Sequence, residues 1–353
     1  MKKILLLTFL LLFPVIVFAE AKVTSHLIDA EIEIGGALSV KELIIVEKDT
    51  DFISRKLNYY SFGNASWDGK TIDLDKGTIY NGQNVTINAV SAFEFDDKVS
   101  FGEFDKNVTE YFPAFDITKP TSNTYTYTDN KDGTGSLKIF HKTNGKKTAY
   151  YIKYVVTNVV VKHNDVKEIN YTFKNLNYHA KETFLRVIIP YETNDELYHV
   201  WVHGNQKGEV QELVTNNESK VGIIAKFPEI GSEINFRMTL PQEQVGVDIY
   251  LNNSNIDALS EIIKIENDRL NQTTKSNNII YAMKYVLIAL SVIYVLCTII
   301  FIKKYNRNLF IIYVLFGIFI MVFNYLFRFN YWYLYLLIVV PIILVLLKKY
   351  LQK

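Results

Sequence analysis

The strongest constraint on the fold is the uneven placement of charge along the chain. All 37 acidic residues of this 353-residue protein lie between Glu20 and Asp268, and the two ends carry only basic charges. Both ends are also strongly apolar, whereas the middle is net negative. A single water-soluble domain does not segregate charge in this way, which argues against a cytosolic enzyme. An acidic folded region would also repel phosphate, so nucleic-acid binding is not expected.

The N-terminal end is typical of a secretory signal peptide, which we place at residues 1–19. Two lysines precede an apolar run from Ile4 to Phe18. The small residue Ala19 then precedes Glu20, and this pattern favours cleavage between the two. An uncleaved N-terminal anchor is the alternative.

Three apolar segments near the C-terminus have the length of membrane spans. They cover residues 285–302, 309–327 and 331–347, and helices of this size reach across about 25–29 Å. We therefore expect three transmembrane α-helices that make the protein integral to the membrane. Their polar side chains are few, which favours an anchor over a transporter or channel. A protein partner or a second copy of the chain would contact the protein through these spans.

Basic residues beside the apolar segments indicate the orientation. Lys303, Lys304 and Arg307 lie between the first two segments, and Lys348 and Lys349 follow the third. The positive-inside rule places both groups in the cytoplasm. We therefore expect a cell-membrane protein with an extracytoplasmic domain before the first span and a cytoplasmic C-terminus. A signal peptide requires the same orientation.

Alternation of apolar and polar residues dominates the region between the two ends. Residues 28–34, 150–156 and 234–240 each alternate, as half-buried strands do. The pair Gly35-Gly36 follows the first of these runs and predicts a hairpin. Turn dipeptides such as Asp132-Gly133 recur along the chain. These patterns predict a mainly β ectodomain made of two antiparallel β-sandwich-like domains.

We place the first sandwich domain at residues 20–164, with an irregular stretch over about 84–122, and the second at 165–252. A juxtamembrane helix and linker are expected at 253–278, with Ser254 and Asp257 as the helix cap and a polar linker over 271–278. This helix is either a dimerising stalk or packed on the second sandwich. The single cysteine, Cys297, falls in the first apolar segment, so no disulfide is expected in the ectodomain.

Four short segments carry a family resemblance. The run Gly35 to Glu42 with Arg55 beyond it, the strand Tyr151 to Val156, the strand Leu185 to Pro190 and the pair His203-Gly204 occur in this order. Together they resemble the bacterial predicted membrane proteins catalogued as domain of unknown function 2207, over about residues 22–268. Where that family usually has a Trp, this chain has Tyr171-Thr172-Phe173. The resemblance implies architecture and membrane location, and it carries over no catalytic residue.

Enzyme and metal signatures were not found in the exported region. His199 and His203 flank Trp201 on the outward face of a predicted strand, about 13 Å apart, which is too far for one metal ion. Residues 63–71 approach a phosphate-binding loop with one residue too many, and 129–133 are better explained as a hairpin turn than as a calcium loop. We therefore expect no catalytic residue, no cofactor and no metal.

These observations lead to one functional expectation and two alternatives. The protein is expected to be a membrane-anchored bacterial surface protein whose β-rich domain binds, scaffolds or senses without catalysis. An exported hydrolase using a carboxylate pair in residues 84–122 is the first alternative. An accessory subunit of a membrane complex is the second.

Overall fold

The computed structural model describes residues 23–47, 50–59, 85–95, 109–143, 145–174, 180–204, 208–228, 233–246, 252–303 and 307–326. It divides into two units, Met1–Ile265 and Glu266–Lys353, which we call the β unit and the helical unit. The expected signal peptide with its cleavage site, Ala19 and Glu20, lies outside the described residues. The same is true of Lys304, Lys348 and Lys349 and of the expected span at 331–347.

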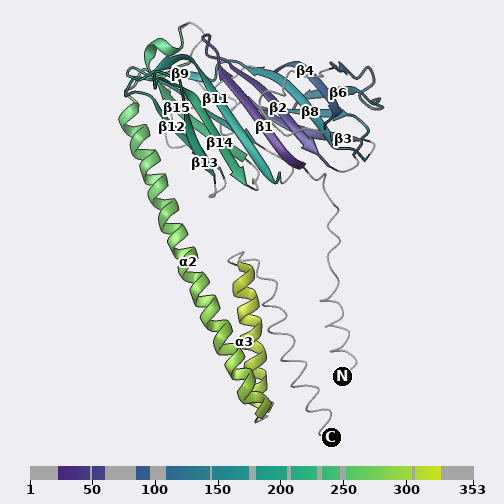
Figure 1. Cartoon of the computed structure of the whole chain (residues 1–353), viewed down its shortest axis with the longest axis vertical. Coiled ribbons are helices and arrows are strands. Elements are labelled where there is room, and N and C mark those ends of the chain that lie inside the picture. Colours follow the sequence, from purple (N-terminus) through teal and green to yellow (C-terminus); the bar gives the residue numbers. More distant parts are fainter. Residues whose placement is uncertain are drawn as a thin grey trace. The chain divides into compact units, whose positions relative to one another are not determined.

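A seven-stranded sheet forms one layer of the β unit (Figure 1). Its strand order is β13 (Glu209–Val214), β14 (Lys220–Pro228), β11 (Glu182–Thr193), β1 (Val23–Ile32), β2 (Leu38–Val46), β8 (Thr148–Val156) and β4 (Val85–Glu94). All neighbours are antiparallel except β1 and β11, which pair in parallel. The predicted hairpin joins β1 and β2, and Gly36 has the positive φ of 78° that a tight turn requires.

Two smaller sheets form the opposite layer. One has the order β12 (His199–His203), β15 (Glu233–Leu240), β10 (Lys167–Lys174), β9 (Val160–Lys162) and β16 (Asn252–Asn253). The other has the order β3 (Phe52–Asn58), β7 (Thr134–Phe140), β6 (Thr124–Asp129) and β5 (Phe112–Pro113). The Tyr171 hydroxyl on β10 donates to the carbonyl oxygen of Asn58 on β3, 2.8 Å away, which links the two small sheets.

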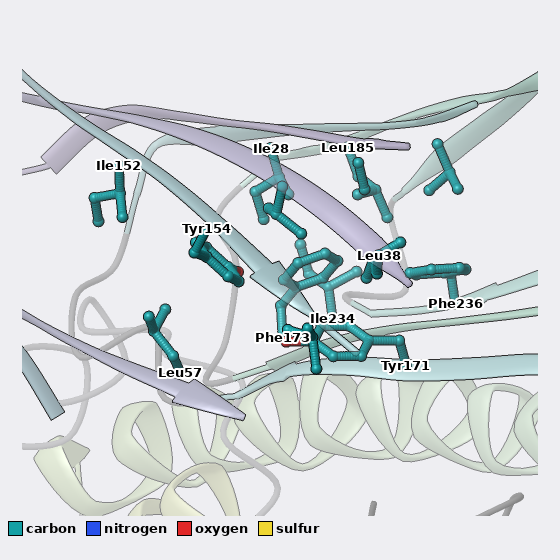
Figure 2. Close-up of a cluster of buried hydrophobic side chains, with 14 of the residues drawn as sticks. Ile28, Leu38, Leu57, Ile152, Tyr154, Tyr171, Phe173, Leu185, Ile234 and Phe236 are labelled. Atoms are coloured by element: carbon teal, nitrogen blue, oxygen red, sulfur yellow. The ribbon is translucent and has the colours of Figure 1, made fainter. Parts of the chain in front are cut away.

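The hydrophobic core lies between the layers (Figure 2). Side chains of the seven-stranded sheet meet those of the two small sheets there: Ile28, Leu38, Ile152, Tyr154 and Leu185 on one side, and Leu57, Tyr171, Phe173, Ile234 and Phe236 on the other. The alternating runs predicted from the sequence supply most of them, because one face of each strand is apolar. Each such side chain contributes about 1.5–3 kcal/mol when fully buried.

The expectation of two separate antiparallel sandwich domains is wrong. The seven-stranded sheet combines β1, β2, β4 and β8, which precede residue 164, with β11, β13 and β14, which follow it. The parallel pairing of β1 with β11 joins the two halves into one sheet. Alternation shows which residues face a core and does not show which strand lies beside which. The expected irregular stretch also begins with a regular ten-residue strand, β4.

Helix α2 (Leu259–Lys303) is continuous over 45 residues and extends from the β unit into the helical unit. The short helix and polar linker expected at 253–278 are therefore replaced by one long helix. Its polar section contains no Gly or Pro, and the hydroxyls of Thr273 and Thr274 donate to the carbonyls of Arg269 and Leu270, each at 2.9 Å. Hydroxyls bonded in this way to the carbonyl four residues earlier can be accommodated inside a helix.

The expectation of three membrane spans is also wrong, and with it the partner contacts assigned to them. Among the described residues one helix, Leu259–Cys297, is long and apolar enough to cross a membrane. Helix α3 (Arg307–Leu326) contains most of the expected second span and packs on α2 around Leu287, Tyr294 and Ile320. Apolar length alone does not distinguish a spanning helix from one that is packed against another helix.

Candidate functional site

The histidines on β12 lie as the sequence predicts. Val200 and Val202 pack against the core, and His199 stacks on Trp201 with ring centroids 5.6 Å apart. Burial, with a smaller effect of Lys220, lowers the pKa of His199. Among the described residues, no group of three or more His, Cys, Asp or Glu side chains could hold a metal ion.

The other motifs considered in the sequence fall into two classes. Asp132 accepts hydrogen bonds from the backbone and hydroxyl of Thr134, and Asp129 accepts one from the Lys131 backbone at 2.9 Å, so this segment is the turn between β6 and β7. The phosphate-loop-like segment at 63–71 lies outside the described residues.

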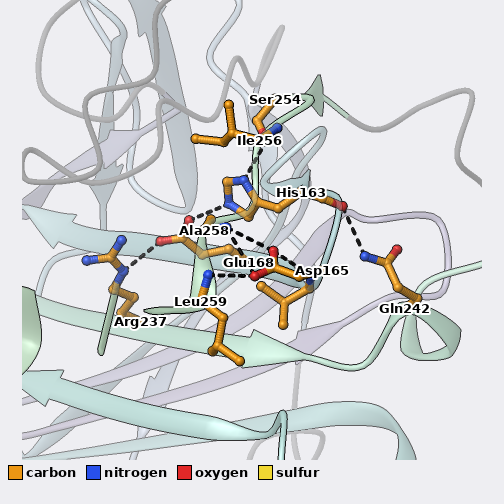
Figure 3. Close-up of polar contacts among 10 residues, drawn as sticks. His163, Asp165, Glu168, Arg237, Gln242, Ser254, Ile256, Ala258 and Leu259 are labelled. Atoms are coloured by element: carbon orange, nitrogen blue, oxygen red, sulfur yellow. Dashed lines mark hydrogen bonds and ion pairs between the residues drawn. The ribbon is translucent and has the colours of Figure 1, made fainter. Parts of the chain in front are cut away.

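A chain of four polar side chains, three of them buried, lies where β9, β10, β15 and β16 meet the start of α2 (Figure 3). His163 Nε2 is 2.8 Å from Glu168 Oε2, and Arg237 Nε donates to Glu168 Oε1 at 2.6 Å. The other ring nitrogen, His163 Nδ1, is 2.6 Å from Ser254 Oγ. We call His163, Glu168 and Arg237 the His163 trio.

Strand geometry places the trio on the sheet face that points away from the core. Ile169 and Phe236 point into the core, so their neighbours Glu168 and Arg237 point to the opposite face. Arg237 is a polar position of the alternating run 234–240, yet its side chain and that of Glu168 are both 0% exposed. A charge that is withdrawn from water in this way is tolerated because it is paired.

The loop before α2 is bound to the turn between β9 and β10. The Asp165 carboxylate accepts hydrogen bonds from the backbone amides of Ala258, at 2.9 and 3.1 Å, and Leu259, at 2.9 Å. These bonds satisfy amides at the helix start that have no partner within the helix. Burial raises the pKa of Asp165, but these backbone hydrogen bonds outweigh it and the net pKa is lowered. The sequence suggested Ser254 and Asp257 for the cap, and Asp165 takes that role.

A second His–Glu–Arg trio lies inside the β unit and consists of His26, Glu42 and Arg55. Glu42 Oε2 is 3.0 Å from His26 Nε2 and accepts from Arg55 Nε at 2.7 Å, and Glu42 Oε1 accepts from Tyr154 Oη at 2.7 Å. Burial opposes ionisation of Glu42, but the charge of Arg55 and the other contacts hold its pKa below the ordinary value. Burial lowers the pKa of His26.

The two trios differ in the solvent exposure of the hydroxyl residue beside each of them. His26, Glu42 and Arg55 are at most 2% exposed, and Tyr154, the hydroxyl residue of that cluster, is 0% exposed. In the His163 trio the three side chains are equally buried, but Ser254 is only half-buried. Sequence reasoning missed both trios, because their members lie on different strands and turns whose pairing no local pattern shows. A lone acidic residue within an apolar run, as at Glu42, was the only available signal.

Comparisons with known proteins give weak likenesses only. No family model and no curated protein matches the chain. A solved structure of a suspected protease from Parabacteroides distasonis has a TM-score of 0.35 at 10% identity, over 63% of this chain and 41% of that one. The M1 zinc metallopeptidase from Deinococcus radiodurans has a TM-score of 0.33 at 8% identity, over 64% and 44%. The chain thus spans less than half the length of these proteins, and likenesses this weak support no statement about activity.

Proposed function

We propose that the protein is a membrane-anchored surface protein whose β unit is displayed on the extracytoplasmic side by helix α2. One observation carries this proposal. Helix α2 starts at amides bound by Asp165 of the β unit and continues without a break into the apolar segment at 285–302. That segment contains no charged side chain, and a mainly apolar helix of eighteen residues matches the hydrocarbon thickness of a bilayer.

Charges beside the apolar segment support the proposed orientation. Lys303 is the last residue of α2 and Arg307 the first of α3, so basic residues follow the apolar segment directly. All acidic residues precede it. The positive-inside rule then places the end of α2 in the cytoplasm and the β unit outside. The N-terminal segment with the pattern of a signal peptide requires the same orientation.

Binding or scaffolding is the role that we propose for the displayed β unit. Its two layers enclose one continuous core without a disulfide, since the only cysteine is Cys297. Support for a hydrolase that uses a carboxylate pair is lacking in the described part of residues 84–122. There Glu94 pairs with Lys146 at 2.6 Å, and Asp116 accepts from the backbone amide of Thr118 at 2.8 Å within one exposed turn.

Cysteine accessibility in intact cells tests the proposal. In a Cys297→Ser background, one variant carries Asn217→Cys in the exposed turn between β13 and β14, and the matched variant carries Asn308→Cys after the apolar segment. A membrane-impermeant maleimide is expected to label position 217 in intact cells and position 308 only after lysis. Labelling of position 308 but not 217 in intact cells would invert the orientation. Recovery of the protein in the soluble fraction would remove the anchor.

A further inference from the structure

We propose that Ser254 is an activated nucleophile, with His163 as its general base, and that it cleaves carboxylic esters. This activity goes beyond the surface role proposed above and does not depend on it. The geometry is that of a nucleophile, a base and a group that orients the base: Ser254 Oγ lies 2.6 Å from His163 Nδ1, and His163 Nε2 lies 2.8 Å from Glu168 Oε2 (Figure 3). Such constellations are recognised by geometry and not by sequence order.

Arg237 helps to determine which ring nitrogen of His163 carries the hydrogen, through its contact with Glu168. Its Nε donates to Glu168 Oε1 at 2.6 Å, which leaves Glu168 Oε2 as the carboxylate oxygen that faces His163. Glu168 Oε2 then takes the hydrogen on His163 Nε2, so that the neutral ring presents the lone pair of Nδ1 to Ser254. The hydroxyl of Ser254 donates its proton to that lone pair. The backbone amide of Ile256 also contacts Ser254 Oγ, at 3.4 Å.

The His26 trio provides an internal comparison. It has the same three residue types and similar distances, with His26 Nε2 3.0 Å from Glu42 Oε2. Its hydroxyl partner, Tyr154, donates to the carboxylate and is 0% exposed, so no substrate reaches it. In the His163 trio the hydroxyl contacts the histidine and not the carboxylate. It belongs to Ser254, a half-buried loop residue. The same Glu–Arg ion pair thus lies beside a fully buried tyrosine in one place and near a half-buried serine in the other.

The proposed ester hydrolysis needs only the side chains of Ser254 and His163, the ester and water. Ser254 Oγ forms a bond to the acyl carbon of the ester while its proton moves to His163 Nδ1. The C–O bond to the alcohol breaks, and the alcohol leaves with that proton. Water then cleaves the acyl-serine, releasing the acid and restoring Ser254. Because an alcohol is a better leaving group than an amine, the proposed substrates are esters and not amides.

A fluorophosphonate probe applied to the full chain in detergent tests the inference. The wild-type protein is expected to be labelled at Ser254, located by mass spectrometry of its peptides, and Ser254→Ala to lose that label. His163→Gln keeps a polar side chain without the base and is expected to slow labelling about 100-fold or more, whereas Ser219→Ala is expected to label like the wild type. Absence of label on Ser254 in the folded wild type, or unchanged labelling of His163→Gln, would overturn the proposal.

A second pair of variants keeps the test decisive if His163→Gln does not fold. Ser254→Cys and Ser219→Cys are made separately in the Cys297→Ser background, and both positions are half-buried. Beside His163 the thiol at position 254 is expected to ionise more readily and to react with iodoacetamide about tenfold faster at pH 7. Equal rates at the two positions would show that His163 does not activate position 254.

Discussion

Glu42 on β2 and Arg55 on β3 form a buried ion pair that joins the two layers of the β unit. Arg55 Nε donates to Glu42 Oε2 at 2.7 Å and Arg55 Nη2 donates to Glu42 Oε1 at 3.0 Å. The two side chains are 0% and 1% exposed, so neither charge has water as an alternative partner. A pair of this kind fixes the position of one sheet on the other more than it adds net stability.

Removing one partner of this pair should be costly. Arg55→Met keeps the apolar volume but leaves the Glu42 carboxylate buried without its cation, and we expect a loss of about 3–5 kcal/mol in the free energy of unfolding. Denaturant unfolding followed by tryptophan fluorescence measures it. Lys146→Met is the control: it breaks the exposed pair with Glu94, where both side chains are more than half exposed, and should cost at most about 1 kcal/mol. Equal effects of the two substitutions would contradict the role of burial.

His26 should make the stability depend on pH below neutrality. Burial lowers its pKa in the folded state, although the adjacent Glu42 opposes this shift and Arg55 adds to it. The unfolded chain therefore takes up a proton near the ordinary value of 6.5 while the folded chain does not. Stability is then complete above that pH and falls as the pH drops below it, by up to about 1.4 kcal/mol per pH unit.

Denaturation midpoints at pH 7.5, 6.5 and 5.5 measure this dependence, and His26→Gln should reduce its slope. The slope will not vanish, because burial also lowers the pKa of His141 and His199, and both act with the same sign. An unchanged slope in His26→Gln would show that His26 is not the group responsible.

Strand faces were predictable from the sequence, and strand partners were not. Ile28, Ala30 and Ile32 and the alternating positions Tyr150 to Val156 and Ile234 to Leu240 are buried, with exposures of at most 1%, because alternation follows directly from the pleat. Ile34, the last apolar position of the predicted run 28–34, is 46% exposed because it lies in the turn after β1. The pairing of Ile28 with Leu185 joins positions far apart in the chain, and no local pattern encodes it. The same limit hid the candidate site, where Ser254, His163 and Arg237 come from three distant segments.

Gly222 shows how a single backbone position supports the pairing of β14 with β11. It lies on β14 opposite Ile188 of β11, with a φ of 149°, and a Cβ atom added there would be 2.0 Å from the carbonyl oxygen of Val187. We therefore expect Gly222→Ala to destabilise the β unit by more than about 2 kcal/mol, since backbone must move. Gly35→Ala is the matched control, because nothing lies within 4 Å of its added Cβ. Thermal unfolding measures the melting temperature of both variants. Similar values for Gly222→Ala and Gly35→Ala would contradict the expected clash.

Asp165 should determine how firmly α2 is held at its start. Its carboxylate accepts from the amides of Ala258 and Leu259, so Asp165→Ala removes an N-terminal cap worth about 0.5–2 kcal/mol. We expect the amides of these two residues to exchange hydrogen faster in Asp165→Ala, and Asp165→Asn to have a smaller effect because one oxygen acceptor remains. Asp257→Ala is the control, since that exposed side chain was the cap suggested by sequence. Faster exchange in Asp257→Ala than in Asp165→Ala would show that Asp257 is the cap, as the local sequence suggests. The start of α2 would then not be held by the turn that carries His163.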